Sequence, residues 1–280
     1  MHLKLPVKSR KFNALVAILG IASLFCPAAS AQVPELDPEQ ESWIASQIFA
    51  NECSRQTSCL TSWNAGEDFP SLGLGHFIWY RRDQEEIYTE TFPDLLHFYH
   101  EQGIETPNWI TELPSPDSPW QDREQFYREI NSPPMVELRA FLAATLEVQA
   151  RFISRRQRAA LPAILAHAPT SQRRQLTALY EQVAASKPPY GIYALIDYVN
   201  FKGEGTAPAE RYGNRGWGLL QVLQFMLENP GNMAPLNHFV ASAEFVLRQR
   251  VANAPAERNE ERWLTGWLNR LATYRPPDQG

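Results

Sequence analysis

Apolar side chains recur at helical spacing over much of this chain, and that periodicity constrains the fold more than any other feature. The longest such segment runs from Met135 through residues 138, 141, 142 and 146 to Ile153. Repeats of this kind place apolar residues on one face of a helix. Shorter segments predict further helices over 170–185, 190–201, 216–228, 236–253 and 257–274. We therefore expect a mainly α fold (α+β) with a small β-hairpin.

The first 31 residues have the pattern of a cleavable secretory signal. A basic start, with Lys4 and Lys8, precedes an apolar run over 12–25 and the small-residue site Ala29-Ser30-Ala31. Signal peptides combine these three features. We expect cleavage after Ala31 and a periplasmic or secreted mature protein.

Residues 32–280 are expected to form a single α-rich domain. No run in them reaches the roughly 20 apolar residues of a membrane helix. The signal carries four of the 26 Lys and Arg residues and none of the 31 Asp and Glu residues, so the mature chain has an excess of nine acidic residues. Such a balance disfavours nucleic acid as a partner.

No sequence pattern indicates a cofactor or a metal. The chain has no P-loop, dinucleotide fingerprint or Gly-x-Ser-x-Gly elbow. His97 and His100 stand at i, i+3 spacing beside Glu101, but we interpret them as an exposed polar helix face. The arginine-rich segment from Arg151 is similarly interpreted as a solvated face.

A helix is predicted from Pro38 to about Glu52. Asp37, Pro38 and Gln40 resemble an N-cap, a first-turn proline and a capping partner. Glu52 then falls at the C-terminal end, just before Cys53 and Cys59. In an oxidising compartment these two cysteines are expected to form a disulfide rather than a zinc site.

Turn residues and aromatic residues dominate the next segment, from Ser62 to Tyr80. Asn, Gly, Asp and Pro in "WNAGEDFPSLGLGH" predict turns and a short hairpin. Aromatic rings offer flat faces to sugars and are equally common in cores. The candidate substrate-binding residues here are Trp63, Asn64, Glu67, Asp68, His76, Trp79 and Tyr80.

A second candidate site lies between residues 193 and 226. Glu204 stands between two glycines just after an apolar helix, and "GWGLLQ" opens the next helix. A glutamate beside apolar residues can have the raised pKa that a proton donor to a glycosidic oxygen needs. The candidate binding residues here are Tyr212, Trp217 and Gln221.

The first segment resembles the lysozyme-like superfamily, and in particular phage-type endolysins. In these proteins a helix-terminal Glu precedes a hairpin that ends in Gly-x-Gly-His, here "SLGLGH". The resemblance implies a lysozyme-like helical domain that cleaves a β-1,4 bond of peptidoglycan or a related glycan, with Glu52 as general acid. Those proteins carry an Asp shortly before Gly-x-Gly-His, but the corresponding place here is about Asn64 or Ala65. A hydrolase of this type would have to use Glu67 or Asp68 instead, or do without this carboxylate.

The second segment is similar to lytic transglycosylases and goose-type lysozymes. There a catalytic Glu is followed, somewhat under twenty residues on, by Gly-Leu-Met-Gln; here Gly218-Leu219-Leu220-Gln221 follows Glu204. The resemblance implies that Glu204 is the acid and that these four residues line the floor of a cleft. We hypothesise that Glu52 and Glu204 converge on one site.

Together these features predict an exported glycosidase that acts on peptidoglycan without a cofactor. Two facing carboxylates suit hydrolysis, and a lone glutamate suits transglycosylation. The alternative is a non-catalytic glycan- or protein-binding module on the same scaffold, because a fold does not determine function.

Overall fold

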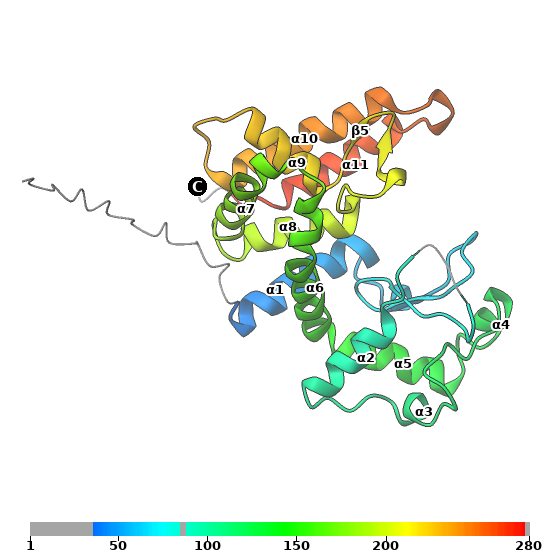
Figure 1. Ribbon diagram of the computed structural model, residues 1–280. Helices are drawn as coiled ribbons and strands as arrows, with labels where there is room; N and C mark the ends of the chain where they lie inside the picture. Colours follow the sequence, from blue (N-terminus) through cyan, green and yellow to red (C-terminus); the bar gives the residue numbers. More distant parts are fainter. Residues whose placement is uncertain (1–35, 85–87, 278–280) are drawn as a thin grey trace, which may run out of the picture. The chain divides into compact units, whose positions relative to one another are not determined.

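The computed structural model describes residues 36–84 and 88–277 (Figure 1). The expected signal peptide and its cleavage point after Ala31 lie outside these residues. The described residues belong to one compact unit and are mainly α-helical, as the periodicity predicts. No helix among them combines the length and apolar character needed to cross a membrane.

Helix α1 (Pro38–Cys53) begins as the sequence predicts. The Asp37 carboxylate accepts a hydrogen bond from the Gln40 amide at 2.9 Å, and the Gln40 side chain accepts one from the Asp37 amide at 3.3 Å. This reciprocal capping satisfies two amides that a helix start leaves unpaired. Glu52 lies in the last turn, so the predicted helix-end position is confirmed.

A short 3₁₀ turn, η1 (Thr57–Leu60), leads into a small antiparallel sheet. Its strands are β1 (Thr61–Ser62), β2 (Ser71–Leu72) and β3 (Phe77–Ile78), in that order across the sheet. Leu72 pairs with Thr61 on one side and with Phe77 on the other. The predicted hairpin over 62–80 is therefore present, with one strand more than a simple hairpin.

The helices that follow the sheet are α2 (Phe92–Glu101), α3 (Asn108–Thr111) and α4 (Arg123–Arg128). Helix α2 carries His97 and His100, and Gly103 follows its end in a left-handed conformation, with φ of 67°. The short helices α3 and α4 were not predicted. Each has at most six residues, which is too short for a helical period to be recognised.

The long periodic segment from Met135 to Ile153 forms two helices rather than one. Helix α5 (Pro133–Ala144) ends at Thr145, and α6 (Leu146–Ala166) begins directly after it. The fully buried Gln149 side chain donates to the Leu142 carbonyl at 2.7 Å and accepts from the Leu74 amide at 2.7 Å. This one amide therefore joins α5, α6 and the turn between β2 and β3.

The C-terminal half is helical apart from one short hairpin. Its helices are α7 (Thr170–Ala184), α8 (Tyr190–Lys202), α9 (Leu219–Glu228), α10 (Pro235–Asn253) and α11 (Glu261–Ala272), with 3₁₀ turns η2 (Pro208–Glu210) and η3 (Ala256–Arg258). Strands β4 (Arg211–Tyr212) and β5 (Arg215–Gly216) pair antiparallel between α8 and α9. This second hairpin was not predicted.

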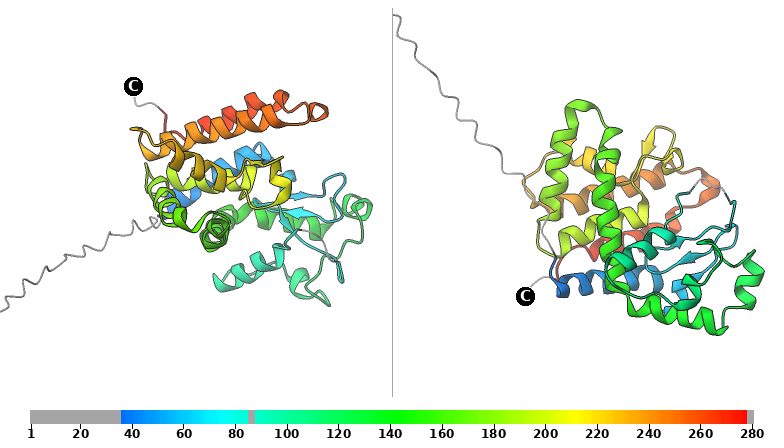
Figure 2. Two further views of the ribbon diagram at one scale, coloured as in Figure 1. Left: turned by 45° about the horizontal axis from the view of Figure 1, so that its top comes forward. Right: turned by 60° about the horizontal axis from the view of Figure 1, so that its bottom comes forward.

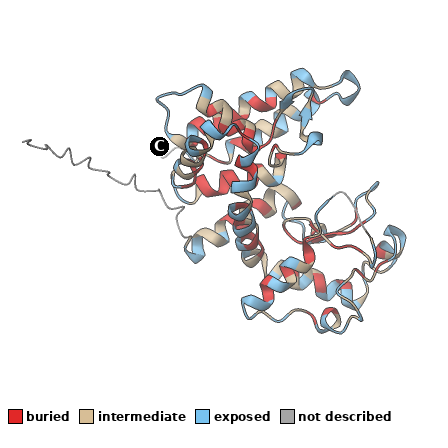
Figure 3. Cartoon of the chain, in the orientation of Figure 1, coloured by how far each residue is buried: buried red, intermediate tan, exposed pale blue. Residues whose placement is uncertain are grey.

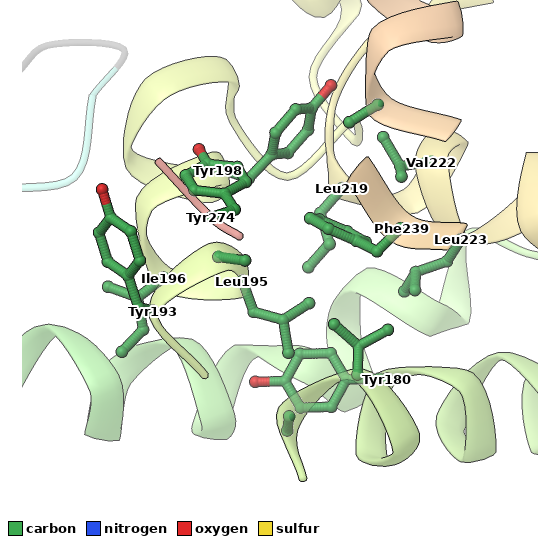
Figure 4. Close-up of a cluster of buried hydrophobic side chains, with 14 of the residues drawn as sticks. Tyr180, Tyr193, Leu195, Ile196, Tyr198, Leu219, Val222, Leu223, Phe239 and Tyr274 are labelled. Atoms are coloured by element: carbon green, nitrogen blue, oxygen red, sulfur yellow. The ribbon is translucent and has the colours of Figure 1, made fainter. Parts of the chain in front are cut away.

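Helix α6 connects two hydrophobic clusters, and it packs against α1, α2, α7 and α8 (Figure 2). One cluster contains the sheet, α2 to α5 and Phe152 of α6; the other contains α7 to α11 and Ile164 of α6. Buried residues follow both clusters in Figure 3. Figure 4 shows part of the second cluster, including Tyr193, Tyr198 and Tyr274.

Replacing the buried Gln149 with Leu is expected to lower the free energy of unfolding by about 2 kcal/mol or more. The substitution leaves the Leu74 amide and the Leu142 carbonyl buried without partners, and each such group costs roughly 1–3 kcal/mol. Urea denaturation measures the loss. Gln175→Leu on the exposed face of α7 is the matched control, and an equal effect of both variants would contradict the role of Gln149.

Candidate functional site

Glu204 lies on a loop that the backbone and two glycines hold in place. Gly203 and Gly205 on either side have φ values of 86° and 84°, a region that favours glycine. At the start of α9, the Leu219 amide donates to the Gly203 carbonyl and the Leu220 amide donates to the Glu204 carbonyl, each at 3.0 Å. The first amides of a helix have no partner within it. Here the carbonyl groups of the loop accept the hydrogen bonds of the first amides of α9.

The Gln221 side chain forms two further hydrogen bonds to the backbone of this loop and of the start of α9. Its Oε1 accepts from the Gly218 amide and its Nε2 donates to the Gly205 carbonyl, both at 3.0 Å. A Cβ on Gly205 would come within 2.1 Å of the Gln221 Oε1, and one on Gly218 within 2.0 Å of the Gly205 nitrogen. Both positions therefore require glycine. The polar atoms of Gln221, predicted as a binding residue, are used inside the loop.

The Glu204 carboxyl has a raised pKa. Desolvation by the surrounding protein is the main cause, and the nearby Glu210 carboxylate raises it further. Arg156, His167 and a hydrogen bond with Thr206 act in the opposite direction. The net effect is a pKa above the usual value for a glutamate, so Glu204 loses its proton at a higher pH than an ordinary glutamate does.

Glu204 also lines a cavity of about 340 Å³, hereafter the Glu204 cavity. Its walls come from three places: the end of the first sheet, one face of α6 and the last turns of α8. The lining residues are Gly75, Phe77, Ile153, Arg156, Gln157, Ala159, Ala160, Ile196, Val199, Asn200 and Glu204. A carboxyl with a raised pKa at the edge of a cavity is a candidate functional group.

One acceptor in the wall has no partner. The side chain of Gln157 donates from Nε2 to the Leu195 carbonyl at 2.7 Å, but its buried Oε1 has no hydrogen-bond partner among the described residues. Buried polar atoms are nearly always paired, by water where not by protein. This atom therefore marks a place in the wall where a water or a ligand donor would be stabilised.

Glu52 lies beside this cavity, in a different electrostatic setting. Its carboxylate forms an ion pair with Arg270 of α11 and accepts a hydrogen bond from the side-chain Nδ2 of Asn200 at 3.4 Å. Asn200 is a lining residue of the Glu204 cavity, whereas Glu52 is not. Glu52 is thus ion-paired with a guanidinium and hydrogen-bonded to a residue that lines the cavity, whereas Glu204 lines the cavity itself and is desolvated beside a second carboxylate.

Arg270 also binds a fully buried carboxylate, Asp197 of α8. Two hydrogen bonds of 2.8 Å join the guanidinium to both Asp197 oxygens, and the Tyr274 hydroxyl donates to Oδ2 at 2.6 Å. The Asn51 side chain contacts Oδ1 at 3.2 Å. Hydrogen bonding to Asp197 and attraction to Asp197 and Glu52 outweigh desolvation and raise the pKa of Arg270.

The predicted aromatic residues lie in the core. Trp63, Trp79, Tyr80 and Trp217 are at most 6 % exposed. The Trp63 indole donates to the Glu67 carbonyl at 2.7 Å, that of Trp79 to the Pro116 carbonyl at 2.8 Å. Their buried positions explain the aromatic density of this segment as packing, and do not support the binding role expected from the sequence.

The predicted polar binding residues near the first sheet lie outside the lining of the Glu204 cavity. Asn64 and Asp68 are exposed, and Asn64 donates to the Glu67 carboxylate at 3.2 Å. His76 is half-buried with a φ of 48°. Tyr212 donates from its hydroxyl to Glu260 at 2.6 Å.

Cys53 and Cys59 form the expected disulfide, with their Cα atoms 5.4 Å apart. His76 lies against it, and its Nε2 is 4.0 Å from the Cys59 sulfur. The three side chains are close enough to suggest a metal site. Because a metal ligand must be a thiolate, the disulfide leaves the histidine without cysteine co-ligands.

Sequence reasoning missed Arg156 and Asn200. Arg156 belongs to the arginine-rich segment that was interpreted as a solvated face. Arg151, Arg155 and Arg156 are all exposed, as that interpretation expects; Arg151 and Arg155 pair with Glu41 and Glu101, whereas Arg156 also lines the Glu204 cavity, which the interpretation did not foresee. Residues 153, 156, 157 and 160 share one helical face, which is the signal that could have found it.

Comparison of the chain with protein-family models, with curated proteins and with solved structures found no match. The lysozyme-like resemblance therefore continues as a proposal that rests on the motifs around Glu52 and Glu204.

Replacing Arg270 with Ala is expected to destabilise the protein by about 3–5 kcal/mol, because it leaves the buried Asp197 carboxylate without its cation. Chemical denaturation followed by circular dichroism measures the change. The control is Arg128→Ala, which breaks the exposed pair with Glu124 and is expected to cost under about 1 kcal/mol. Similar losses for both variants would show that the buried ion pair is not a main stabilising contact.

Proposed function

We propose that this protein is an exported glycosidase that cleaves β-1,4 bonds of peptidoglycan, with Glu204 as the general acid. The observation that carries the proposal is the raised pKa of Glu204 at the edge of a cavity. A glycosidic oxygen is a poor leaving group until it is protonated, and a carboxylic acid that stays protonated near neutral pH can supply that proton. The motifs shared with lysozyme-like proteins point to the same substrate class.

In the proposed reaction the glycan lies in the Glu204 cavity with its scissile oxygen next to the Glu204 carboxyl. Transfer of the Glu204 proton to that oxygen accompanies cleavage of the bond to the anomeric carbon and leaves positive charge on the sugar ring. The Glu204 carboxylate, now ionised, then accepts a proton from the attacking nucleophile. A water gives hydrolysis, and a hydroxyl of the same sugar gives an anhydro product.

Glu52 is suited to the second carboxylate role. Its carboxylate is ion-paired with Arg270 and hydrogen-bonded to Asn200, which lines the cavity. A fixed carboxylate near a developing oxocarbenium ion stabilises it, as glycosidases with two carboxylates require. The frame of Gly203, Gly205 and Gln221 supports the proposal by restricting the position of Glu204, since catalytic groups must be held to within a fraction of an ångström.

The second candidate is a non-catalytic glycan-binding module. Two observations favour it: the Glu52 carboxylate is engaged by Arg270, and the predicted aromatic platform is buried in the core. In this case the Glu204 cavity would hold a glycan without cleaving it.

Product analysis tests the proposal. Purified mature protein is incubated with peptidoglycan sacculi, and the soluble products are identified by mass spectrometry. We expect Glu204→Gln to reduce product formation about a hundredfold or more, because general acid catalysis contributes roughly 10²–10⁴-fold. Glu52→Gln is expected to reduce it as well, and Glu124→Gln on the exposed face of α4 is the control.

Each outcome has a defined meaning. Reducing-end products identify a hydrolase, and anhydro products identify a transglycosylase. An inactive Glu52→Gln variant beside a fully active Glu204→Gln variant would transfer the acid role to Glu52. Sacculi that remain intact but bind the protein would favour the binding module.

The pH profile gives a further prediction. Because the acid must be protonated, activity is expected to fall as pH rises through the Glu204 pKa. The Glu210 carboxylate raises that pKa, so Glu210→Gln is expected to lower it and to move the basic limb of kcat/KM toward lower pH. Glu67→Gln, remote from the cavity, is the control, and an unmoved limb in Glu210→Gln would exclude Glu204 as the titrating group.

A further inference from the structure

Arg156 stands out among the arginines of its segment because, within the described part of the chain, it has no hydrogen-bond or ion-pair partner. Arg151 and Arg155, on the same helix, pair with Glu41 and Glu101. Among the described residues Arg156 forms neither a hydrogen bond nor an ion pair within 4 Å, and its guanidinium carbon lies 5.6 Å from the centre of the Phe152 ring. Its five N–H donors are therefore open to a ligand.

Arg156 lies in the wall of the Glu204 cavity. The residue is exposed, and the lining of the cavity also includes Glu204 and Asn200. Although the residue is exposed, its guanidinium is near enough to protein atoms for partial desolvation to lower its pKa, which the charges of Asp94 and Glu204 oppose. An arginine nevertheless stays charged at neutral pH, so the cavity carries a positive charge.

A ligand for such a group is a planar anion. The guanidinium fork matches a carboxylate with two parallel hydrogen bonds, and a lysine or an amide cannot reproduce that geometry. Among β-1,4 glycans, peptidoglycan carries carboxylates on the peptides attached to alternate sugars, whereas chitin carries none.

We propose that Arg156 binds a carboxylate of the substrate and makes the Glu204 cavity selective for peptide-bearing peptidoglycan over neutral β-1,4 glycans. This inference rests on the proposed function for the identity of the glycan. Arg156 acts as a specificity-determining residue, and it takes no part in the proton transfer.

Calorimetric binding tests the proposal with the full mature chain. The ligands are a peptidoglycan disaccharide with free peptide carboxylates, the same fragment with those carboxylates amidated, and a chito-oligosaccharide. The proteins are the wild type, Arg156→Gln, Arg156→Lys and the matched control Arg155→Gln, each checked for an unchanged melting temperature. Glu204→Gln, assayed alongside, reports cleavage separately.

We expect Arg156→Gln to weaken binding of the carboxylate-bearing fragment by about 10- to 100-fold, the range of a charge-assisted hydrogen-bonded pair. Binding of the amidated fragment and of the chito-oligosaccharide is expected to change less than about threefold. Arg156→Lys should restore part of the loss, because it keeps the charge without the fork. Arg155→Gln should match the wild type.

Equal losses for charged and neutral ligands, or no loss at all, would overturn the inference. Carboxylate-dependent binding through Arg156 without any cleavage would uphold the inference and overturn the proposed enzymatic function. Cleavage that is lost in Glu204→Gln but unchanged in Arg156→Gln, with no carboxylate-dependent loss of binding, would uphold the proposed enzymatic function and overturn the inference about Arg156. A wild-type protein that binds none of the three ligands would overturn both.

Discussion

The ion pairs of Arg270 with Asp197 and Glu52 connect three helices that are far apart in sequence. Helix α11 supplies the guanidinium, α8 the buried carboxylate and α1 the carboxylate beside the cavity. Each charge would be costly alone in the interior, and together they have a favourable arrangement only when all three helices are docked. The ends of α1 and α8, from which both candidate glutamates project, therefore depend on a single arginine near the C-terminus.

Glu52 and Glu204 are the same type of residue in two contrasting environments. Glu52 is held by a cation, and Glu204 is desolvated next to the carboxylate of Glu210. The two surroundings act on the same kind of side chain in different ways, by ion pairing in one case and by desolvation in the other. The loop that carries Glu204 is stiff for a local reason: its glycines leave no room for a Cβ and Gln221 occupies the space.

Local signals predicted much of the fold. The capping pattern at Asp37 placed the start of α1, and the periodicity placed α7 to α10, because both depend on residues close in sequence. The break at Thr145 was not predictable, since the apolar period continues through it and the Gln149 contact with Leu74 that accompanies the break bridges residues far apart in the chain. The second hairpin has strands of two residues, too short to show alternation.

Of the two glutamates predicted from the sequence, Glu204 lines the cavity and Glu52 does not, and most of the residues that form the cavity wall were not predicted. Glycines around Glu204 signalled an unusual backbone, which sequence alone can reveal. Whether Trp79 faces a ligand or the core depends on which helices cover it, and that is a tertiary property. From the sequence, Arg156 could not be distinguished from Arg151 and Arg155, because charge composition does not show which face of a helix a residue occupies.

The buried Gln149 amide sets a narrow limit on how this sequence can vary. It is a donor toward Leu142 and an acceptor toward Leu74 at once. Glutamate would lack the donor, leucine would lack both groups, and asparagine would be one methylene too short for the same reach. We therefore expect few substitutions to be tolerated at position 149, even where the surrounding apolar residues replace one another. In related sequences this buried glutamine should then vary less than the hydrophobic core around it.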